Sequence, residues 1–233
     1  MRHFIRRSLE RGFADHGWLQ SRHTFSFADY YDPRHMGFRS LRVINEDWIA
    51  PGGGFPTHPH RDMEIFTVMI SGELEHRDSM GNQARIRPGD IQLMSAGTGI
   101  THSEYNPDSA HPAHLLQIWI EPRQRGLNPG YTEWRPSPQT AAQTKALIIS
   151  PTGREESAHL QQDAEIYRLK IPAGEHIAHT IERGRGVWLQ MIAGRVECDG
   201  NTLEAGDALY TEEPLTLDMR ARSSVDALLF DLA

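Results

Sequence analysis

Two histidines one residue apart are the first residues of this chain whose types and spacing suit chemistry. They are His58 and His60, in the stretch Phe-Pro-Thr-His-Pro-His-Arg-Asp-Met-Glu that ends at Glu64. Side chains alternate between the two faces of a β-strand, so His58 and His60 point to one face, and Glu64 can share it. Two imidazoles directed into one cavity are half of a metal site.

The other half lies further along the chain. Gly97 and Gly99 form a glycine turn, and His102 and Glu104 follow it, again two residues apart. Two strands then each present a pair of ligands by the same alternation. Three imidazoles and one carboxylate suit Fe(II), which we expect as a single divalent ion per chain, and they also accept Zn, Ni, Cu, Mn or Co. Four protein ligands leave room on the metal for water, a substrate or O₂.

Short strands between glycine and proline turns must position these residues. Runs of β-branched and aromatic residues are bounded by turns such as Ser71-Gly72 and Pro88-Gly89-Asp90. The runs predict strands over residues 23–27, 41–45, 65–70, 73–77, 91–94, 100–104 and 115–120. This pattern is typical of an all-β barrel or sandwich.

The second half of the chain repeats the first. Met69-Ile-Ser-Gly-Glu-Leu-Glu75 resembles Met191-Ile-Ala-Gly-Arg-Val-Glu197, and similar turns follow in the same order, which indicates duplication of one β unit. The segment between the halves is rich in proline and lacks apolar periodicity. We therefore predict a first domain at residues 1–121, an interdomain linker at 122–145 and a second domain at 146–233.

The repeat also predicts which half holds the metal. With the offset between the halves applied, the four ligand positions fall at Thr180, Glu182, Met219 and Ala221. His176 and His179 lie nearby but are three residues apart, which places them on opposite faces of a strand. The second domain is therefore expected to carry no metal site.

Composition limits the kinds of partner. The chain has 233 residues, a formal net charge of −7 and no basic run that would follow phosphates, so we expect no direct binding to nucleic acid. The single cysteine, Cys198, allows no internal disulfide. The first residues are not followed by an apolar secretory segment, and no apolar run is long enough to cross a bilayer. We expect a cytoplasmic protein without a membrane partner.

Several short sequence motifs resemble those of a known family. Gly52-x5-His58-x-His60-x3-Glu64-x7-Gly72 resembles the first cupin motif, with one extra residue before the last glycine. Gly97-x-Gly99-x2-His102-x3-Asn106 resembles the second, with Gly97 where a proline is usual. Longer words are similar to the pirin family, among them Leu41-Arg-Val-Ile-Asn-Glu-Asp47, Thr57-His-Pro-His60 and Met94-Ser-Ala-Gly-Thr-Gly99. The resemblance implies an all-β bicupin, with two cupin jelly-roll barrels in tandem.

The resemblance also implies site residues. Pirins bind one metal in the N-terminal barrel through three histidines and one glutamate, which are His58, His60, His102 and Glu104 in this chain. Glu64 then moves to a supporting position, behind the ligands or in the wall of the substrate pocket, with a salt bridge to Arg61 or another surface cation as the alternative. Four further residues are predicted either to line that pocket or to pack in the core: Phe25, Phe27, Met36 and Phe38. The remaining histidines of this half, including His23 and His76, are expected in loops or at the rim.

Function follows from the same resemblance. The chain is similar to short bacterial pirins of the quercetin 2,3-dioxygenase type, which implies cleavage of a flavonol by O₂ with release of CO, and Glu104 as acceptor of the enol proton. An alternative is an iron-dependent regulator that binds a protein partner, either a transcription factor or a metabolic enzyme, without catalysis. A third is a cupin acting on another small molecule, because fold does not fix function.

Overall fold

Strands form almost every regular element of this chain. The computed structural model describes residues 3–233, and its contacts divide the chain into two units. The N-terminal unit is Gly12–Arg135, and the C-terminal unit joins Pro136–Ala233 to the described residues up to Arg11. The prediction of an all-β fold is confirmed. No helix among the described residues is long and apolar enough to cross a membrane.

The N-terminal unit contains two sheets. The larger has seven strands in the order β12-β9-β6-β11-β4-β3-β2, and the smaller has four in the order β5-β10-β7-β8. In chain order the strands are β2 (Gly12–Asp15), β3 (Leu19–His23), β4 (Leu41–Ile49), β5 (Gly54–His60), β6 (Glu64–Ser71), β7 (Leu74–Asp78), β8 (Gln83–Ile86), β9 (Ile91–Ser95), β10 (Ile100–Tyr105), β11 (Ala113–Ile120) and β12 (Gly130–Trp134).

The C-terminal unit repeats this plan. Its sheets have the orders β1-β20-β17-β22-β15-β13-β14 and β16-β21-β18-β19. The elements are β1 (Phe4–Arg6), a 3₁₀ turn at Ser8–Glu10, α1 (Pro138–Ala141), β13 (Lys145–Ser150), a 3₁₀ turn at Arg154–Glu156, β14 (Ala158–His159), β15 (Ala164–Ile171), β16 (His176–Thr180), β17 (Gly186–Ala193), β18 (Val196–Cys198), β19 (Asn201–Leu203), β20 (Ala208–Thr211), β21 (Thr216–Ala221) and β22 (Val225–Leu232). The small sheets and the five inner strands of the large sheets correspond one to one, as duplication predicts. The outer strands differ, since β14 pairs in parallel with β13 whereas β2 pairs antiparallel with β3.

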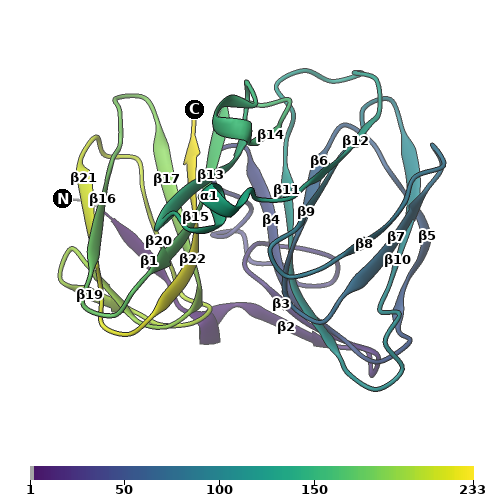
Figure 1. Cartoon of the computed structure of the whole chain (residues 1–233), viewed down its shortest axis with the longest axis horizontal. Coiled ribbons are helices and arrows are strands. Elements are labelled where there is room, and N and C mark those ends of the chain that lie inside the picture. Colours follow the sequence, from purple (N-terminus) through teal and green to yellow (C-terminus); the bar gives the residue numbers. More distant parts are fainter. Residues whose placement is uncertain (1–2) are drawn as a thin grey trace. The chain divides into compact units, whose positions relative to one another are not determined.

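The edge strands differ from the predicted domain boundaries. β12 lies within the predicted linker 122–145, yet it pairs with β9 in the large sheet of the N-terminal unit. β1 lies within the predicted first domain, yet it pairs with β20 of the C-terminal unit, and Figure 1 draws it in purple beside that strand. Both pairings are long-range hydrogen-bonded contacts, which local composition does not report.

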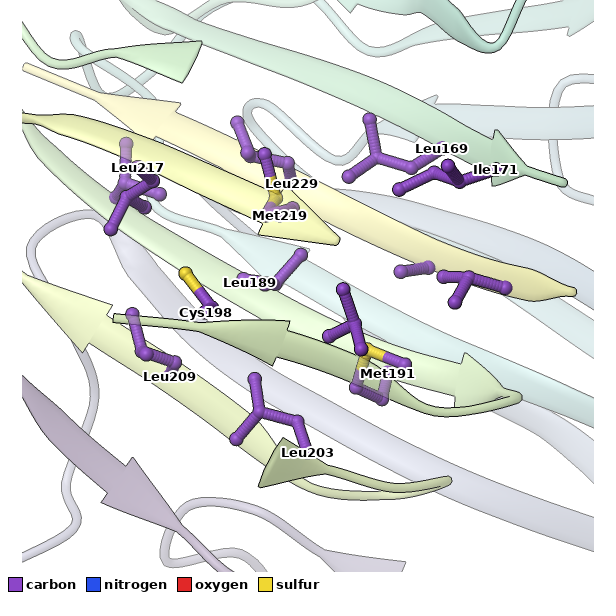
Figure 2. Packing of buried hydrophobic residues seen from close by; sticks show 14 of the residues in the cluster. Leu169, Ile171, Leu189, Met191, Cys198, Leu203, Leu209, Leu217, Met219 and Leu229 are labelled. Carbon is purple, nitrogen blue, oxygen red and sulfur yellow. The ribbon is translucent and has the colours of Figure 1, made fainter. Parts of the chain in front are cut away.

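The two interiors are filled differently. A single large cluster of buried aliphatic residues fills the C-terminal unit, and Figure 2 shows side chains such as Leu189, Leu217 and Met219 packed between its strands. The N-terminal unit contains smaller clusters, among them one around Ile49 and Met69 and one around Ile65 and Met94. It also has a cavity whose lining includes buried polar side chains.

Candidate metal centre

Strands β5 and β10 bring the predicted histidines together. They are antiparallel neighbours in the small sheet, with His58 directly opposite His102 and His60 opposite Ile100. The imidazole centroids of His58 and His102 are 4.4 Å apart, and that of His60 lies 4.8 Å from His58 and 4.9 Å from His102. One nitrogen of each ring lies within 4.8 Å of the other two. Strand alternation therefore selected three side chains that do converge.

Glu104 joins this group through a local irregularity of β10. The pairing with β5 shifts between His102 and Glu104, as in a β-bulge, a device that re-aims side chains at functional sites. A carboxylate oxygen of Glu104 lies within 4.8 Å of ring nitrogens of His102 and His76. Glu104 is buried, and it lines the same cavity as His58 and His60.

His60 and His102 are in the protonation state that binds metal ions. Burial and the neighbouring histidines lower the pKa of His60 to about 4 and that of His102 to about 2, so both rings are neutral at pH 7, the form that binds metals. The His58 Nδ1 donates to the Pro56 carbonyl at 2.8 Å, which leaves Nε2 as the electron-pair donor. Burial and the nearby carboxylate of Asp47 raise the pKa of Glu104 to about 7, against the hydrogen bond from Thr67.

Two orphaned atoms test whether a metal fits. The Nε2 atoms of His60 and His102 are buried and have no hydrogen-bond partner. Unpaired buried polar atoms are rare, because each loses its hydration without compensation. A divalent ion accepts electron pairs from both nitrogens, so the residues present fit such an ion.

His76 is a buried member of the site, so its predicted place in a loop or at the rim is wrong. It lies on β7, fully buried, with its Nδ1 3.4 Å from the Nδ1 of His102. Gln92 Nε2 lies 2.6 Å from the same His76 nitrogen, and Asp78 Oδ2 lies 3.5 Å from His76 Nε2. Tyr131, on β12, stacks against the ring at 5.1 Å. His76 thus contacts the side of His102 that faces away from the metal position, where supporting residues orient ligands.

A cavity of about 660 Å³ opens beside the histidines. Its volume lies in the range of pockets that hold small organic ligands. His58, His60 and Glu104 line it together with aromatic side chains and a similar number of polar ones. The aromatic residues are Phe13, Trp18, Phe27, Tyr30, Phe55 and Trp119, and the other polar residues include Ser21, His23, Asn45, Asp47 and Gln117.

Among the predicted pocket residues, Phe27 lines this cavity and the other four do not. Phe25 is 2% exposed and packs in the core, Met36 is 42% exposed at the surface, and Phe38 lies in a loop bridged to Leu41. The predicted strand over residues 23–27 ends at His23, so the alternation that grouped these aromatic residues does not continue.

Glu64 also lies outside the cavity. The chain leaves β5 after His60, Asp62 adopts φ of +49°, and Glu64 begins β6 in the other sheet. There its carboxylate is buried and accepts a hydrogen bond of 2.8 Å from Ser95. The alternation that placed Glu64 beside His58 fails because the strand does not extend that far.

The C-terminal barrel keeps one of the four ligand positions. His179 lies opposite Leu217 as His58 lies opposite His102, and Met219 lies opposite Cys198 as Glu104 lies opposite His76. The equivalents of the four ligands are therefore His179, Ile181, Leu217 and Met219. The predicted set of Thr180, Glu182, Met219 and Ala221 is displaced by one or two residues, because the turns before these strands differ in length between the halves.

His179 is occupied by other partners. Lys145 Nζ donates to its Nδ1 at 2.8 Å, and its Nε2 donates to Asp231 at 2.8 Å. The groups of metal-ligating side chains found among the described residues both lie in the N-terminal unit.

Known families match both halves. A family model described as Pirin matches residues 5–120, and one described as Quercetinase C-terminal cupin domain matches residues 147–232. The chain belongs to the pirin family. The predicted family and the tandem cupin fold are thereby confirmed.

Relatives agree over nearly the whole length. The chain is 48% identical to quercetin 2,3-dioxygenase of Escherichia coli K12 over 98% of both chains, and 38% identical to a pirin-like protein of Caulobacter vibrioides over 95% of this chain and 96% of that protein. Its structure is similar to that of the bacterial pirin YhhW of Escherichia coli in complex with nickel(II), with 46% identity, a TM-score of 0.95 and coverage of 99% of each chain.

Proposed function

We propose that this pirin is a metal-dependent dioxygenase of the quercetin 2,3-dioxygenase type, which cleaves a flavonol with O₂ and releases CO. The observation that carries the proposal is a cavity of small-molecule size that His58, His60 and Glu104 line together with six aromatic side chains, next to the cluster that these two histidines form with His102. A flat polyphenol suits such walls, since aromatic rings gain from stacking and edge contacts as well as from burial.

His58, His60, His102 and Glu104 would hold the metal, which we propose to be Fe(II), with Ni, Zn, Cu, Mn or Co able to replace it at these ligands. When bound, a divalent metal supplies Lewis acidity toward the 3-hydroxyl oxygen of the flavonol and the chemistry that O₂ requires. Among solved relatives, the structure of YhhW in complex with nickel(II) supports a divalent ion in this family.

Glu104 is the proposed proton acceptor. Its carboxylate receives one long contact of 3.5 Å from Thr67, whose hydroxyl donates to Gln117 at 2.7 Å instead. Glu104 therefore keeps an oxygen available for the proton of the flavonol 3-hydroxyl. Trp119 packs edge-on against His60 at 4.9 Å and, with Phe55, excludes bulk water from the place where that proton moves.

The test is aerobic turnover by protein loaded separately with Fe(II), Ni, Cu, Mn and Co. We expect loss of the flavonol absorbance of quercetin together with stoichiometric CO. His102→Ala should abolish both, whereas His111→Gln, which changes an exposed histidine outside the cavity, should leave both intact. Absence of turnover with every metal would contradict the proposal, as would undiminished turnover by His102→Ala.

A further inference from the structure

A row of polar side chains crosses the inner face of the large sheet in the N-terminal unit. Five neighbouring strands each place one such residue in register, so that consecutive members are direct partners across the sheet. The row runs in the order Gln92, Thr67, Gln117, Asn45 and His23, and all five are buried. Asp47 and Ser21, also opposite each other, lie beside its far end.

Four members of this polar row are bonded in two pairs, and the fifth, Gln92, contacts His76. Besides the bond from Thr67 to Gln117, His23 Nδ1 lies 2.9 Å from the Asn45 side-chain oxygen, and Ser21 donates to Asp47. Such bonds reduce the penalty of burying polar groups in a barrel, but they leave several donors and acceptors directed at the cavity. Ser21, His23, Asn45, Asp47 and Gln117 all line it.

The fold does not require these polar groups. In the C-terminal barrel the corresponding positions, matched strand by strand, are Leu209, Leu189, Leu229, Tyr167 and Leu147. Leu169 stands where the N-terminal barrel has Asp47. Four of these five positions, and the position of Asp47, therefore carry leucine in the C-terminal barrel, so the architecture closes without the polar row.

Among these residues, Asp47 buries a carboxyl group. It is 3% exposed, and its carboxyl group has Ser21 as its hydrogen-bond partner among the described residues. Its surroundings on the neighbouring strands are Ser21 and Leu19 on β3 and Leu115 on β11. Glu46 and His114 act on it electrostatically, and its own carboxylate acts in the same way on Glu104. A buried carboxyl group that faces a cavity without a cation suits a hydroxyl group, which can both donate to it and accept from it.

We propose that Asp47, held in place by Ser21, binds a hydroxyl group of an aromatic substrate and so orients its ring system toward His58, His60 and Glu104. The proposal rests on the proposed function for the identity of the substrate class, a hydroxylated flavonoid. It makes Asp47 a specificity-determining residue: its carboxyl group would distinguish ligands by hydroxyl groups other than the 3-hydroxyl.

The experiment measures binding without turnover. Metal-loaded protein under argon is titrated with quercetin and with 3-hydroxyflavone, which keeps the 3-hydroxyl and lacks the others, and binding is followed by quenching of tryptophan fluorescence, since Trp18 and Trp119 line the cavity. The wild-type protein should prefer quercetin by about 10- to 100-fold, the range expected for hydrogen bonds that involve a carboxyl group.

Variants separate recognition from structure. Asp47→Leu should weaken the binding of quercetin by about the same factor and leave the affinity for 3-hydroxyflavone within about threefold of wild type, so that the preference for quercetin disappears. Asp47→Asn, which keeps the shape of the side chain, should lose part of that preference. Glu64→Gln is the matched control, because it alters a buried carboxyl group outside the cavity and should keep the wild-type preference. Metal content and melting temperature are measured for every variant.

The possible outcomes separate failure of the Asp47 proposal from failure of the dioxygenase proposal. A preference unchanged in Asp47→Leu and Asp47→Asn would overturn the inference, and so would equal weakening of both ligands, which is the mark of a structural role. If quercetin is bound selectively through Asp47 but not oxidised, the dioxygenase proposal fails and this inference stands. If quercetin is oxidised and the Asp47 variants keep the preference, this inference alone fails. If neither flavonol binds the wild type, both fail.

Discussion

The two barrels of this chain have the same strand order and opposite interiors. In the N-terminal barrel the inner face carries the histidine cluster, the polar row and Asp47. In the C-terminal barrel most matched positions carry aliphatic side chains, with Tyr167 and His179 as exceptions. Cys198 stands where the N-terminal barrel has His76, and Leu217 stands where it has His102. Figure 2 shows the sulfur of Cys198 among these apolar neighbours.

This difference separates what the fold needs from what the site needs. A barrel with Leu189, Leu209 and Leu229 on its inner face gains burial free energy at each position. A barrel with Thr67, Gln92 and Gln117 there must satisfy polar groups instead, and Gln92 Oε1 remains without a partner. Retaining such groups in one copy of a duplicated unit is consistent with selection for binding chemistry in that copy.

The largest expected effect is on metal content. His102→Ala removes a neutral imidazole from the cluster and should weaken metal binding by more than about 100-fold, beyond what loss of a supporting residue causes. Elemental analysis of purified protein should then fall from about one metal per chain to near zero. His179→Ala changes the position equivalent to His58 and should leave the metal stoichiometry unchanged. A loss of metal in that variant would show that the ion is bound in the C-terminal barrel and would contradict the prediction.

The next effect is on stability, and it is asymmetric. Leu229→Gln places an amide in the aliphatic interior of the C-terminal barrel and should lower the free energy of unfolding by about 3 kcal/mol or more, through lost apolar burial and an unpaired polar group. Gln117→Leu makes the reverse change in the N-terminal barrel and should lower it by about 1 kcal/mol, since Thr67 loses its acceptor. Urea unfolding of metal-free protein measures both, and equal losses would contradict the distinction between the interiors.

A smaller effect is expected at His76, which orients His102. His76→Leu removes the contact to the His102 Nδ1 and should weaken metal binding by about 10- to 100-fold without changing the ligands. His76→Gln, which can still accept a hydrogen bond, should recover part of this loss. The absorption spectrum of Co-loaded protein reports ligand geometry independently of activity, and an unchanged spectrum and affinity in His76→Leu would assign the residue to packing alone.

The smallest effect is a difference in pH dependence between two buried aspartates. Burial raises the pKa of Asp47 to about 7, above its ordinary value of 3.8, so the folded state favours the protonated form and loses stability as pH rises through 7. Between pH 6 and pH 8 that loss is about 1.4 kcal/mol, and Asp47→Asn should escape it. Unfolding of metal-free protein at pH 6 and pH 8 measures the difference, and parallel curves for the two proteins would contradict it.

Asp231 in the C-terminal barrel should behave in the opposite way. Although burial opposes it, the hydrogen bonds from His179 and Arg185 hold the pKa of Asp231 below its ordinary value, so it stabilises the fold above pH 3.8 and that contribution is lost as pH falls further. Asp231→Asn should therefore be less stable than wild type at both pH 6 and pH 8. A gain in stability at pH 8 would show that the pair with His179 is not stabilising.

The histidine pairs were predictable because the information is local. Alternation along β5 and β10 directs His58, His60 and His102 to one side, and the glycine turn after Gly97 positions the second strand. His76 was predictable by the same rule, since Leu74, His76 and Asp78 alternate along β7, but a single histidine in a polar run gave no reason to prefer the buried face. Glu64 was misplaced because alternation was extended through a residue, Asp62, that leaves the strand.

The polar row and the edge strands depend on pairing between distant segments. Thr67, Gln117 and Asn45 become neighbours only once β6, β11 and β4 are aligned in register, and a shift by one residue would turn each to the other face. β12 has no apolar periodicity of its own, and its role appears only when it pairs with β9. Local pattern therefore predicted the side chains that converge, whereas only strand register shows the cavity beside them.

The most direct test is anomalous X-ray diffraction from crystals of the nickel-loaded protein, recorded at the nickel edge. We predict one anomalous peak per chain, within coordination distance of His58, His60, His102 and Glu104, and none near His179. A peak in the C-terminal barrel, or one bound by His76 with His58 and His60 left uncoordinated, would contradict the assignment of the metal chemistry to the polar barrel.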